Sequence, residues 1–206
     1  RLGAALGLNV LAILRPQDRL LAPGPSTVMR GGDQLIVEGL LSQLEELQAR
    51  DNLQLDDRPV DLTELVSAEA EFAEVQVAAN SALVGQTLAQ IGFRHQFGVN
   101  ILAIRHDGQL RRSDLQERPL YVGDALLIHA TQVQLKFLAE LPDFGTVSQL
   151  SPPEVEKEYR LRETLLSLVI PPESILAGRT LAESRLGDAF GLSVLGIRRN
   201  GKTKLA

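Results

Sequence analysis

The 206-residue sequence is long enough for one or two domains, and its hydrophobic fraction of 44% and charged fraction of 23% are ordinary for a folded soluble protein. A net charge of −5 argues against a nucleic-acid-binding surface, and the absence of Cys excludes disulfides, thiol catalysis and Cys-ligated zinc. No apolar run approaches the roughly 18 residues that span a bilayer.

The chain repeats itself. The stretch GVNILAIRHDGQLRRSDLQERPLYVGDALLIHA, from Gly98 to Ala130, occurs in altered form at Gly7 to Gly39, and its opening recurs at Gly191. The copies are 91 and 93 residues apart, which is too long for a solenoid unit and is the size of a small domain. We therefore expect a tandem array of small domains.

The ends of the sequence are also related. RLGAALGLNVLAI, from Arg1, and RLGDAFGLSVLGI, from Arg185, are identical at nine of thirteen positions. We expect copy one to begin mid-domain and copy three to end mid-domain, so that the chain is an excerpt of something longer. Equivalent positions should then have the same structural surroundings in all three copies: Val10, Ile101 and Val194.

In copy one, the apolar run Leu8–Leu14 predicts a buried strand. A tight turn at Gly31-Gly32-Asp33 leads into a second strand, Gln34–Glu38. Leucines at helical spacing predict an amphipathic helix over Leu40–Ala49. The acidic stretch that follows is interpreted as a linker.

In copy two, alternation predicts a strand over Glu71–Ala79, followed by a helix from Gln86 to about Phe97 that Gly98 terminates. A buried strand, Val99–Ile104, then turns at His106-Asp107-Gly108, a typical hairpin sequence. The strand Ala125–Ala130 and the helix Thr131–Leu141 complete the copy.

In copy three, the segments Thr164–Pro171 and Ile175–Gly187 match the first strand and the helix of copy two. Each unit is thus predicted to be α+β, a mostly antiparallel sheet with two helices. The expected organisation runs as follows: a partial domain at 1–50, a linker at 51–69, a complete domain at 70–145, a second proline-containing linker at 146–163 and a partial domain at 164–206.

Three recurring pieces carry a family resemblance. LVGQTL at 83–88 recurs as LAGRTL at 176–181, the Gly-Leu/Val-x-Val/Ile-Leu-Ala/Gly-Ile strand occurs three times, and GDQLI at 32–36 recurs as GDALLI at 123–128. In this fixed order they resemble TrkA-C domains, the C-terminal domains of potassium-conductance regulators, and cover nearly all of the chain except the linkers. No G-x-G-x-x-G occurs, so a dinucleotide-binding lobe is not expected in this sequence.

The resemblance implies a non-catalytic regulatory module on the cytoplasmic face of the plasma membrane. Its partner would be a transmembrane transport domain of a potassium, cation or anion transport system, in the same or another chain. Such domains form homodimers through paired units, and some bind a small effector of the nucleotide type, such as a cyclic dinucleotide. Tandem units without a dinucleotide-binding lobe resemble the soluble insert of sodium/anion symporter-like permeases.

The resemblance also implies ligand contacts at the helix-to-strand junction of the complete copy, at Arg94 and Asn100, with Leu88 contributing to an apolar floor. Copy three departs from this pattern, because Ser193 stands in place of Asn100. For these residues the alternative is structural: a solvated Arg near a helix end, a strand residue and a core leucine.

Other candidate sites are weak. The three histidines, His95, His106 and His129, lack metal-ligand spacing, and no Ser has a His/Asp pattern that would support nucleophilic catalysis. We expect no cofactor, no metal and no enzymatic activity. Two alternatives remain open: a purely structural assembly module without a ligand, and an enzyme whose catalytic groups lie outside this sequence.

Overall fold

The computed structural model describes residues 12–14, 19–21, 23–24, 26–39, 53–68, 70–184 and 193–199. These residues form two compact units. The central unit comprises the described residues of 66–163, and the composite unit comprises those of 7–65 together with those of 164–206. Copies one and three of the repeat therefore contribute to the same unit.

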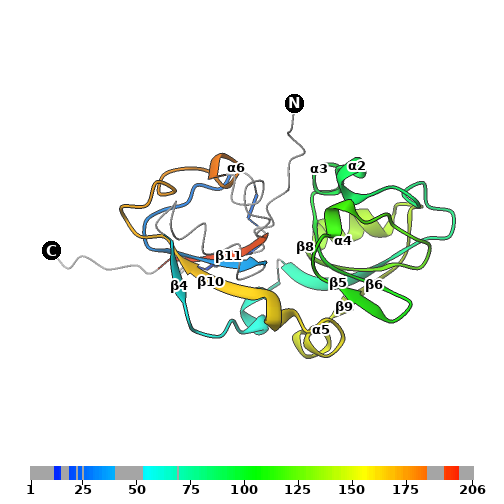
Figure 1. Cartoon of the computed structure of the whole chain (residues 1–206), viewed down its shortest axis with the longest axis horizontal. Coiled ribbons are helices and arrows are strands. Elements are labelled where there is room, and N and C mark those ends of the chain that lie inside the picture. The colour runs from blue at the N-terminus through cyan, green and yellow to red at the C-terminus, as the bar shows by residue number, and fades with distance from the viewer. Residues whose placement is uncertain are drawn as a thin grey trace. The chain divides into compact units, whose positions relative to one another are not determined.

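The central unit contains a five-stranded antiparallel sheet in the order β7-β6-β8-β5-β9. Figure 1 labels β5, β6, β8 and β9 of this sheet. Its strands are β5 (Ala70–Val77), β6 (Asn100–His106), β7 (Gln109–Arg111), β8 (Ala125–Thr131) and β9 (Phe144–Leu150). The helical segments are α2 (Leu88–Ile91), α3 (Phe93–Phe97), η2 (Leu115–Glu117), α4 (Gln132–Ala139) and α5 (Pro152–Tyr159).

One face of the central sheet carries the largest hydrophobic cluster of this unit. Side chains at alternate positions of β5 and β8, such as Val75 and Ile128, pack with Phe93, Phe97 and Phe144. Helix α4 contacts β5, β8 and β9. The β6–β7 connection is the expected two-residue hairpin, with positive φ at both Asp107 and Gly108, as a type I′ turn requires.

The recurring LVGQTL piece is a helix start. Gly85 adopts φ +83, and Thr87 caps α2 in a reciprocal capping box with Gln90. The flanking Leu83 and Leu88 are buried in the core. The sequence motif therefore encodes a turn, a cap and two core contacts.

The composite unit has a sheet in the order β1-β2-β11-β3-β10-β4, with an additional β1–β3 pairing, and every pairing is antiparallel. Its strands are β1 (Ala12–Leu14), β2 (Arg19–Leu21), β3 (Asp33–Glu38), β4 (Gln54–Asp56), β10 (Leu165–Val169) and β11 (Ser193–Arg199). Its helical segments include η1 (Leu62–Leu65) and α6 (Leu181–Ser184), and η3 (Leu161–Thr164) ends where this unit resumes.

The composite unit reproduces the central unit strand by strand. In the central sheet Val75 pairs with Leu126, and at the equivalent positions Leu168 of β10 pairs with Leu35 of β3. The helix start is repeated as well, because Thr180 and Glu183 make the same reciprocal hydrogen bonds as Thr87 and Gln90. Copy three thus supplies β10 and α6 to the strands of copy one.

Two strands of the composite unit have the same partners. Ile13 of β1 and Ile197 of β11 both pair with Leu20 of β2 and with Leu35 of β3. Both strands are copies of β6, whose Ile104 occupies this register opposite Leu126. One strand edge offers one row of backbone hydrogen-bonding groups, so we infer that β1 and β11 compete for one position.

The equivalence expected at Ile101 and Val194 agrees with these registers. Ile101 pairs with Ile128 of β8, and Val194 pairs with Val37, the equivalent residue of β3. Val10 lies outside the described residues, as does the helix expected over Leu40–Ala49.

The ranges expected to be linkers contain regular structure. β4 and η1 lie within 51–69, β9 crosses the boundary at 145, and α5 lies within 146–163. The sequence of these segments resembles linkers for two reasons. β4 and β9 are edge strands, which are partly polar, and α5 begins with prolines, which are tolerated in the first turn of a helix. The helix expected over 86–97 is likewise two short helices, because Gly92 adopts a left-handed conformation between them.

Candidate functional site

The three residues expected to bind a ligand lie around the helix-to-strand junction of the central unit. Leu88 is 2% exposed and belongs to the core. This position agrees with the structural alternative given above, a core leucine. Arg94 lies on α3 and is partly exposed. Asn100 begins β6 opposite His129 of β8 and is 8% exposed.

The junction itself is held by α4. Gln134, which also closes the capping box at Thr131, donates from Nε2 to the carbonyl oxygen of Gly98 at 2.7 Å. Gly98 has φ +71 and ends α3. The Oδ1 atom of Asn100 is buried and accepts no hydrogen bond from any residue in the described part of the chain. Such an atom is costly to bury, and it marks Asn100 as a candidate for an interaction beyond the fold.

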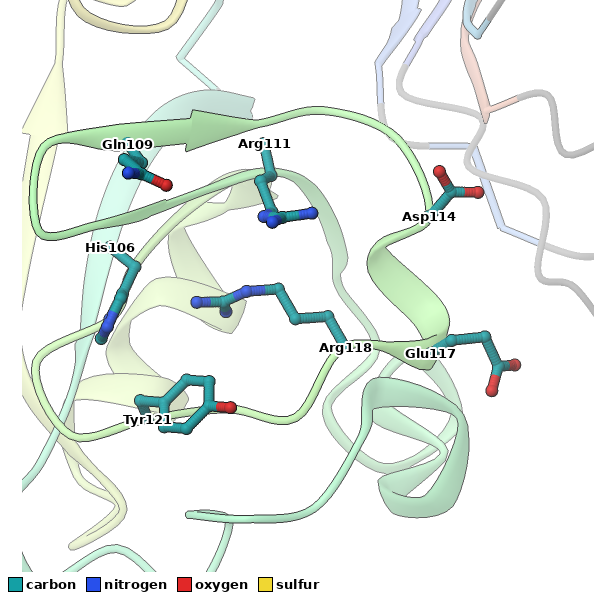
Figure 2. Close-up of a pocket in the computed structure, with 7 residues that line it drawn as sticks. All are labelled: His106, Gln109, Arg111, Asp114, Glu117, Arg118 and Tyr121. Carbon is teal, nitrogen blue, oxygen red and sulfur yellow. The ribbon is translucent and has the colours of Figure 1, made fainter.

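A second candidate is a pocket of about 500 Å³ at the opposite end of β6. It is bordered by His106 at the end of β6, by two residues of β7, and by the loop that leads to β8. Its lining residues are His106, Gln109, Arg111, Asp114, Glu117, Arg118 and Tyr121 (Figure 2).

The buried side chain of Asp124 contacts several of the residues that line this pocket. Its carboxylate accepts hydrogen bonds from Arg118 at 2.7 and 3.3 Å and from the backbone N–H of Tyr121 at 2.9 Å, and it lies 2.7 Å from His106 Nδ1. The guanidinium of Arg118 lies over the Tyr121 ring, 5.2 Å from its centroid, and the His106 ring packs at 5.1 Å from the same ring. A buried carboxylate thereby fixes an arginine, a histidine and a tyrosine side by side.

The composite unit shows which of these contacts the fold requires. Asp33, the equivalent of Asp124, accepts a hydrogen bond from the backbone N–H of Arg30 at 2.8 Å, just as Asp124 does from Tyr121. Yet Thr27 and Leu20 occupy the positions of Arg118 and Arg111. The turn aspartate is thus structural in both units, whereas the surrounding cations and the tyrosine belong to the central unit.

A polar network lies on the other face of the central sheet. Glu74 of β5 accepts hydrogen bonds from Arg105 at 2.6 Å and from the Tyr159 hydroxyl of α5 at 2.5 Å, and Glu158 bonds Arg105 from the far side. Burial, reinforced by the bond to Glu74, raises the pKa of Tyr159 above its ordinary value. This network fastens α5 to the sheet.

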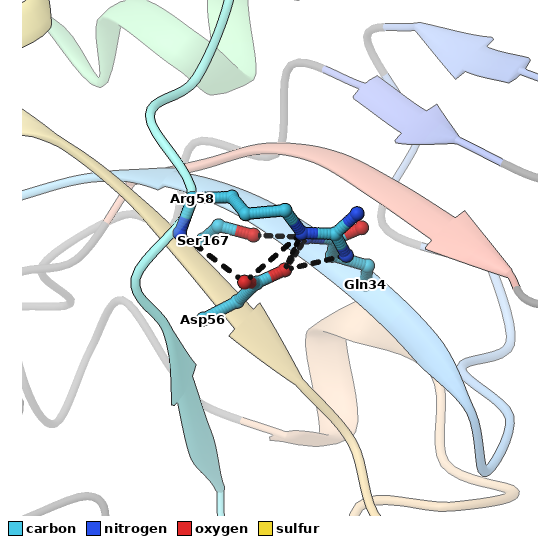
Figure 3. A network of polar contacts seen from close by, with 4 residues as sticks. All are labelled: Gln34, Asp56, Arg58 and Ser167. Carbon is cyan, nitrogen blue, oxygen red and sulfur yellow. Dashed lines mark hydrogen bonds and ion pairs between the residues drawn. The ribbon is translucent and has the colours of Figure 1, made fainter.

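The composite unit has its own network at the equivalent position of its sheet. Gln34 donates from Nε2 to Ser167, the counterpart of Glu74, and to Asp56, each at 2.5 Å (Figure 3). Arg58 then binds Asp56 with hydrogen bonds of 2.9 to 3.2 Å. The first network joins β5, β6 and α5, and the second joins the neighbouring strands β3, β10 and β4, so we assign both to stability rather than to ligand binding.

A metal site and a membrane-spanning helix each have requirements that can be compared with the described residues. Among its residues, no three of His, Asp and Glu gather in an arrangement that could hold a metal ion. Of the helices described, none has the length and apolar character needed to cross a bilayer.

The pocket around Asp124 could not be identified from the sequence. Its residues are ordinary surface types from a hairpin and a loop, and the Arg111-Arg112 pair looks like solvated charge. The structure separates that pair: Arg112 binds Glu163 at 2.8 Å, whereas Arg111 borders the pocket. The sequence does show that the copies differ at positions 111 and 118, but it does not show that the two side chains border one pocket.

Taken together, these units define a tandem α+β repeat built from one folding pattern. The sequence profile of the TrkA-C domain matches residues 72–141 and 165–205, more than half of the chain. The chain therefore belongs to the TrkA-C domain family, as its recurring motifs predicted.

Curated relatives are transporters. The chain is 28% identical over 136 residues to an uncharacterised transporter of Synechocystis, with 62% of this chain and 22% of that protein covered. It is 22% identical to sodium/sulfate cotransporter 1 of Chlamydomonas reinhardtii, with 93% of this chain and 23% of that protein covered. An uncharacterised transporter of Escherichia coli is 32% identical over 57 residues, 28% of this chain and 9% of that protein. The chain spans less than a quarter of each.

Proposed function

We propose that this chain is a non-catalytic regulatory region of an ion transporter, placed at the cytoplasmic face of the membrane. The observation that carries the proposal is the match to the sodium/sulfate cotransporter, which extends over 93% of this chain but only 23% of that protein. Such proportions fit a module within a larger transport protein. The TrkA-C match supports a regulatory role for the module.

The module acts by linkage. An effector that binds one arrangement of the units more tightly than another shifts the transporter's equilibrium by that difference in binding free energy. We propose the junction of α3 and β6 as an effector site, with Arg94 supplying charge and Asn100 supplying a carbonyl oxygen. The buried, unsatisfied Oδ1 of Asn100 supports this assignment. Leu88 would contribute only through its place in the core beneath the site.

The test is ion uptake by the full-length protein that carries this sequence, measured across a panel of nucleotide-type effectors. We expect an effector to change the uptake rate, and Arg94→Gln and Asn100→Ala to abolish that response while uptake without effector persists. Gln96→Ala, an exposed position on the same helix, is the matched control. Uptake that ignores every effector and both substitutions would refute the sensing role.

The alternative, assembly without a ligand, has one favourable observation. Val133 and Phe137 lie four residues apart on one side of α4 and are 77% and 45% exposed. We propose that this surface pairs with a second copy of the chain. Sedimentation equilibrium should then show a dimer that Val133→Gln weakens and Lys136→Gln does not. A chain that stays monomeric at all concentrations would refute both the pairing surface and the assembly function.

A further inference from the structure

We propose that the pocket bordered by Arg111, Arg118 and Tyr121 binds a divalent oxyanion, meaning sulfate, inorganic phosphate or the phosphate group of a larger molecule. This pocket is separate from the α3–β6 junction, because the two lie at opposite ends of the seven-residue strand β6. The binding of the anion is independent of the proposed function. A regulatory effect of that binding rests on the proposed function.

The charges in the pocket are unevenly compensated. The guanidinium groups of Arg111 and Arg118 point into the same space from two sides (Figure 2). Arg118 is balanced by Asp124 behind it, at 2.7 Å. In the part of the chain that the structure describes, no carboxylate lies within ion-pair distance of Arg111. Two cations that face the same space, with a carboxylate paired to only one of them, favour an anion in that space.

The remaining lining groups suit an oxyanion. The amide of Gln109 and the hydroxyl of Tyr121 are donors at the border of the space, and guanidinium groups offer the paired N–H geometry that sulfate and phosphate prefer. The carboxylates of Asp114 and Glu117, which would repel an anion, point away from the two guanidinium groups (Figure 2). A volume of about 500 Å³ accommodates an inorganic anion or a nucleoside diphosphate.

Comparison of the two units supports a role beyond folding. The composite unit builds the same turn with Asp33 and the backbone N–H of Arg30, and it has Thr27 and Leu20 where the pocket has its arginines. The strands and the turn therefore form without these arginines, and Arg111 is exposed. The position of Arg111 is explained by a ligand rather than by stability.

Calorimetric titration of the whole chain tests the proposal at constant ionic strength, with sodium sulfate, sodium phosphate and ADP in separate arms and sodium chloride as the reference. We expect at least one oxyanion to bind, and Arg111→Gln to weaken it by about tenfold, the scale of one charge-assisted hydrogen bond. Arg179→Gln removes an exposed arginine from the composite unit and should leave binding unchanged.

The arms identify the source of the anion. Binding of sulfate or phosphate at an affinity similar to ADP assigns the site to an inorganic ion, whereas much tighter binding of ADP assigns it to a phosphate group on a larger ligand. Equal binding by the wild-type chain and Arg111→Gln, or heats no different from chloride in all three arms, would overturn the proposal. If the transporter binds the oxyanion through Arg111 and its uptake rate does not change, the binding site is confirmed and the regulatory role is refuted.

Discussion

Arg118 shows at the scale of one residue why a buried charge needs its partner. Asp124 has no exposed surface, and Arg118 donates two of its hydrogen bonds. Removing the arginine leaves the buried carboxylate with contacts to His106 and the backbone N–H of Tyr121, so the loss includes the cost of a buried charge that has lost its cation. Deleting Arg118 should therefore lower the stability by more than the ion pair contributes to it in net terms.

We predict that Arg118→Met lowers the free energy of unfolding of the central unit by about 3 kcal/mol, as expected when one partner of a buried ion pair is removed. Arg111→Gln, at the other side of the same pocket, should change it by less than about 0.5 kcal/mol because Arg111 is exposed. Urea unfolding of the three chains measures both. Equal losses in the two variants would mean that Asp124 does not depend on Arg118.

Tyr159 provides a pH-dependent contribution. Its burial and its bond to Glu74 raise the pKa of the phenol in the folded chain, whereas in the unfolded chain the phenol titrates near its ordinary value of about 10. Above that pH the unfolded state binds fewer protons than the folded state. The stability contributed by Tyr159 is thus complete below about pH 10 and declines as the pH rises further.

We predict that the free energy of unfolding falls more steeply above about pH 10 in the wild-type chain than in Tyr159→Phe. The substitution also removes the hydroxyl bond to Glu74, which should cost about 1 kcal/mol at neutral pH. Tyr121→Phe is the control, because that ring is 47% exposed. Denaturation curves at pH 8 to 11, compared across the three chains, decide the matter, and parallel curves would contradict it.

At the scale of the element, the two helix starts show how a short motif specifies structure. Thr87 and Thr180 each exchange hydrogen bonds with the residue three positions later, Gln90 and Glu183. Gly85 and Gly178, with φ of +83 and +88, turn the chain into each helix. Because the helices they begin are only four residues long, the caps contribute a large share of their stability.

We expect Thr87→Ala and Thr180→Ala each to lower the free energy of unfolding by about 1 kcal/mol, the usual cost of losing an N-cap. Each effect should appear in its own unit, so the double variant should show the sum of the two. Hydrogen exchange followed by mass spectrometry assigns the loss to peptides from α2 or α6. Thr63→Ala, at an exposed position, serves as the control. A loss confined to one unit would show that the two motifs are not equivalent.

The same scale explains what the sequence could and could not predict. Buried strands such as β6 and β8 were evident because their apolar residues recur in each copy. Edge strand β9 was interpreted as linker because Gly145, Thr146, Ser148 and Gln149 are exposed and only one side of the strand is apolar. The junction residues were located from the family motif, whereas the pocket depends on a loop that brings Arg118 opposite Arg111, and no spacing in the sequence encodes that approach.

At the scale of the whole chain, copies one and three complete one another. The register of β10 against β3 is that of β5 against β8, although β3 and β10 lie more than a hundred residues apart in sequence. Strands from two different repeats thus form one sheet with the register found within a single repeat. The consequence is an excess of strands, since β1 and β11 both match the position between β2 and β3.

Proline substitution tests whether β1 and β11 are alternatives. A proline at Ile13 or Ile197 removes a backbone donor from the middle of one strand and prevents its pairing. If both strands serve the position about equally, Ile13→Pro or Ile197→Pro alone should cost only about 0.4 kcal/mol, the loss of one of two equally populated states. The double variant should lose about 3 kcal/mol or more, because no strand then covers that edge of β3.

Small losses in the single variants with a large loss in the double variant would show that Ile13 and Ile197 are coupled. If the loss of unfolding free energy in the double variant equals the sum of the single losses, the proposal is contradicted. Hydrogen exchange of the β3 peptide provides the sharper measurement, since the amides of β3 that face this position are protected whenever either strand is paired. Protection should persist in both single variants and disappear in the double variant. If Ile13→Pro alone removes protection while Ile197→Pro has no effect, β1 is the sole occupant, and copy three contributes to this sheet only through β10.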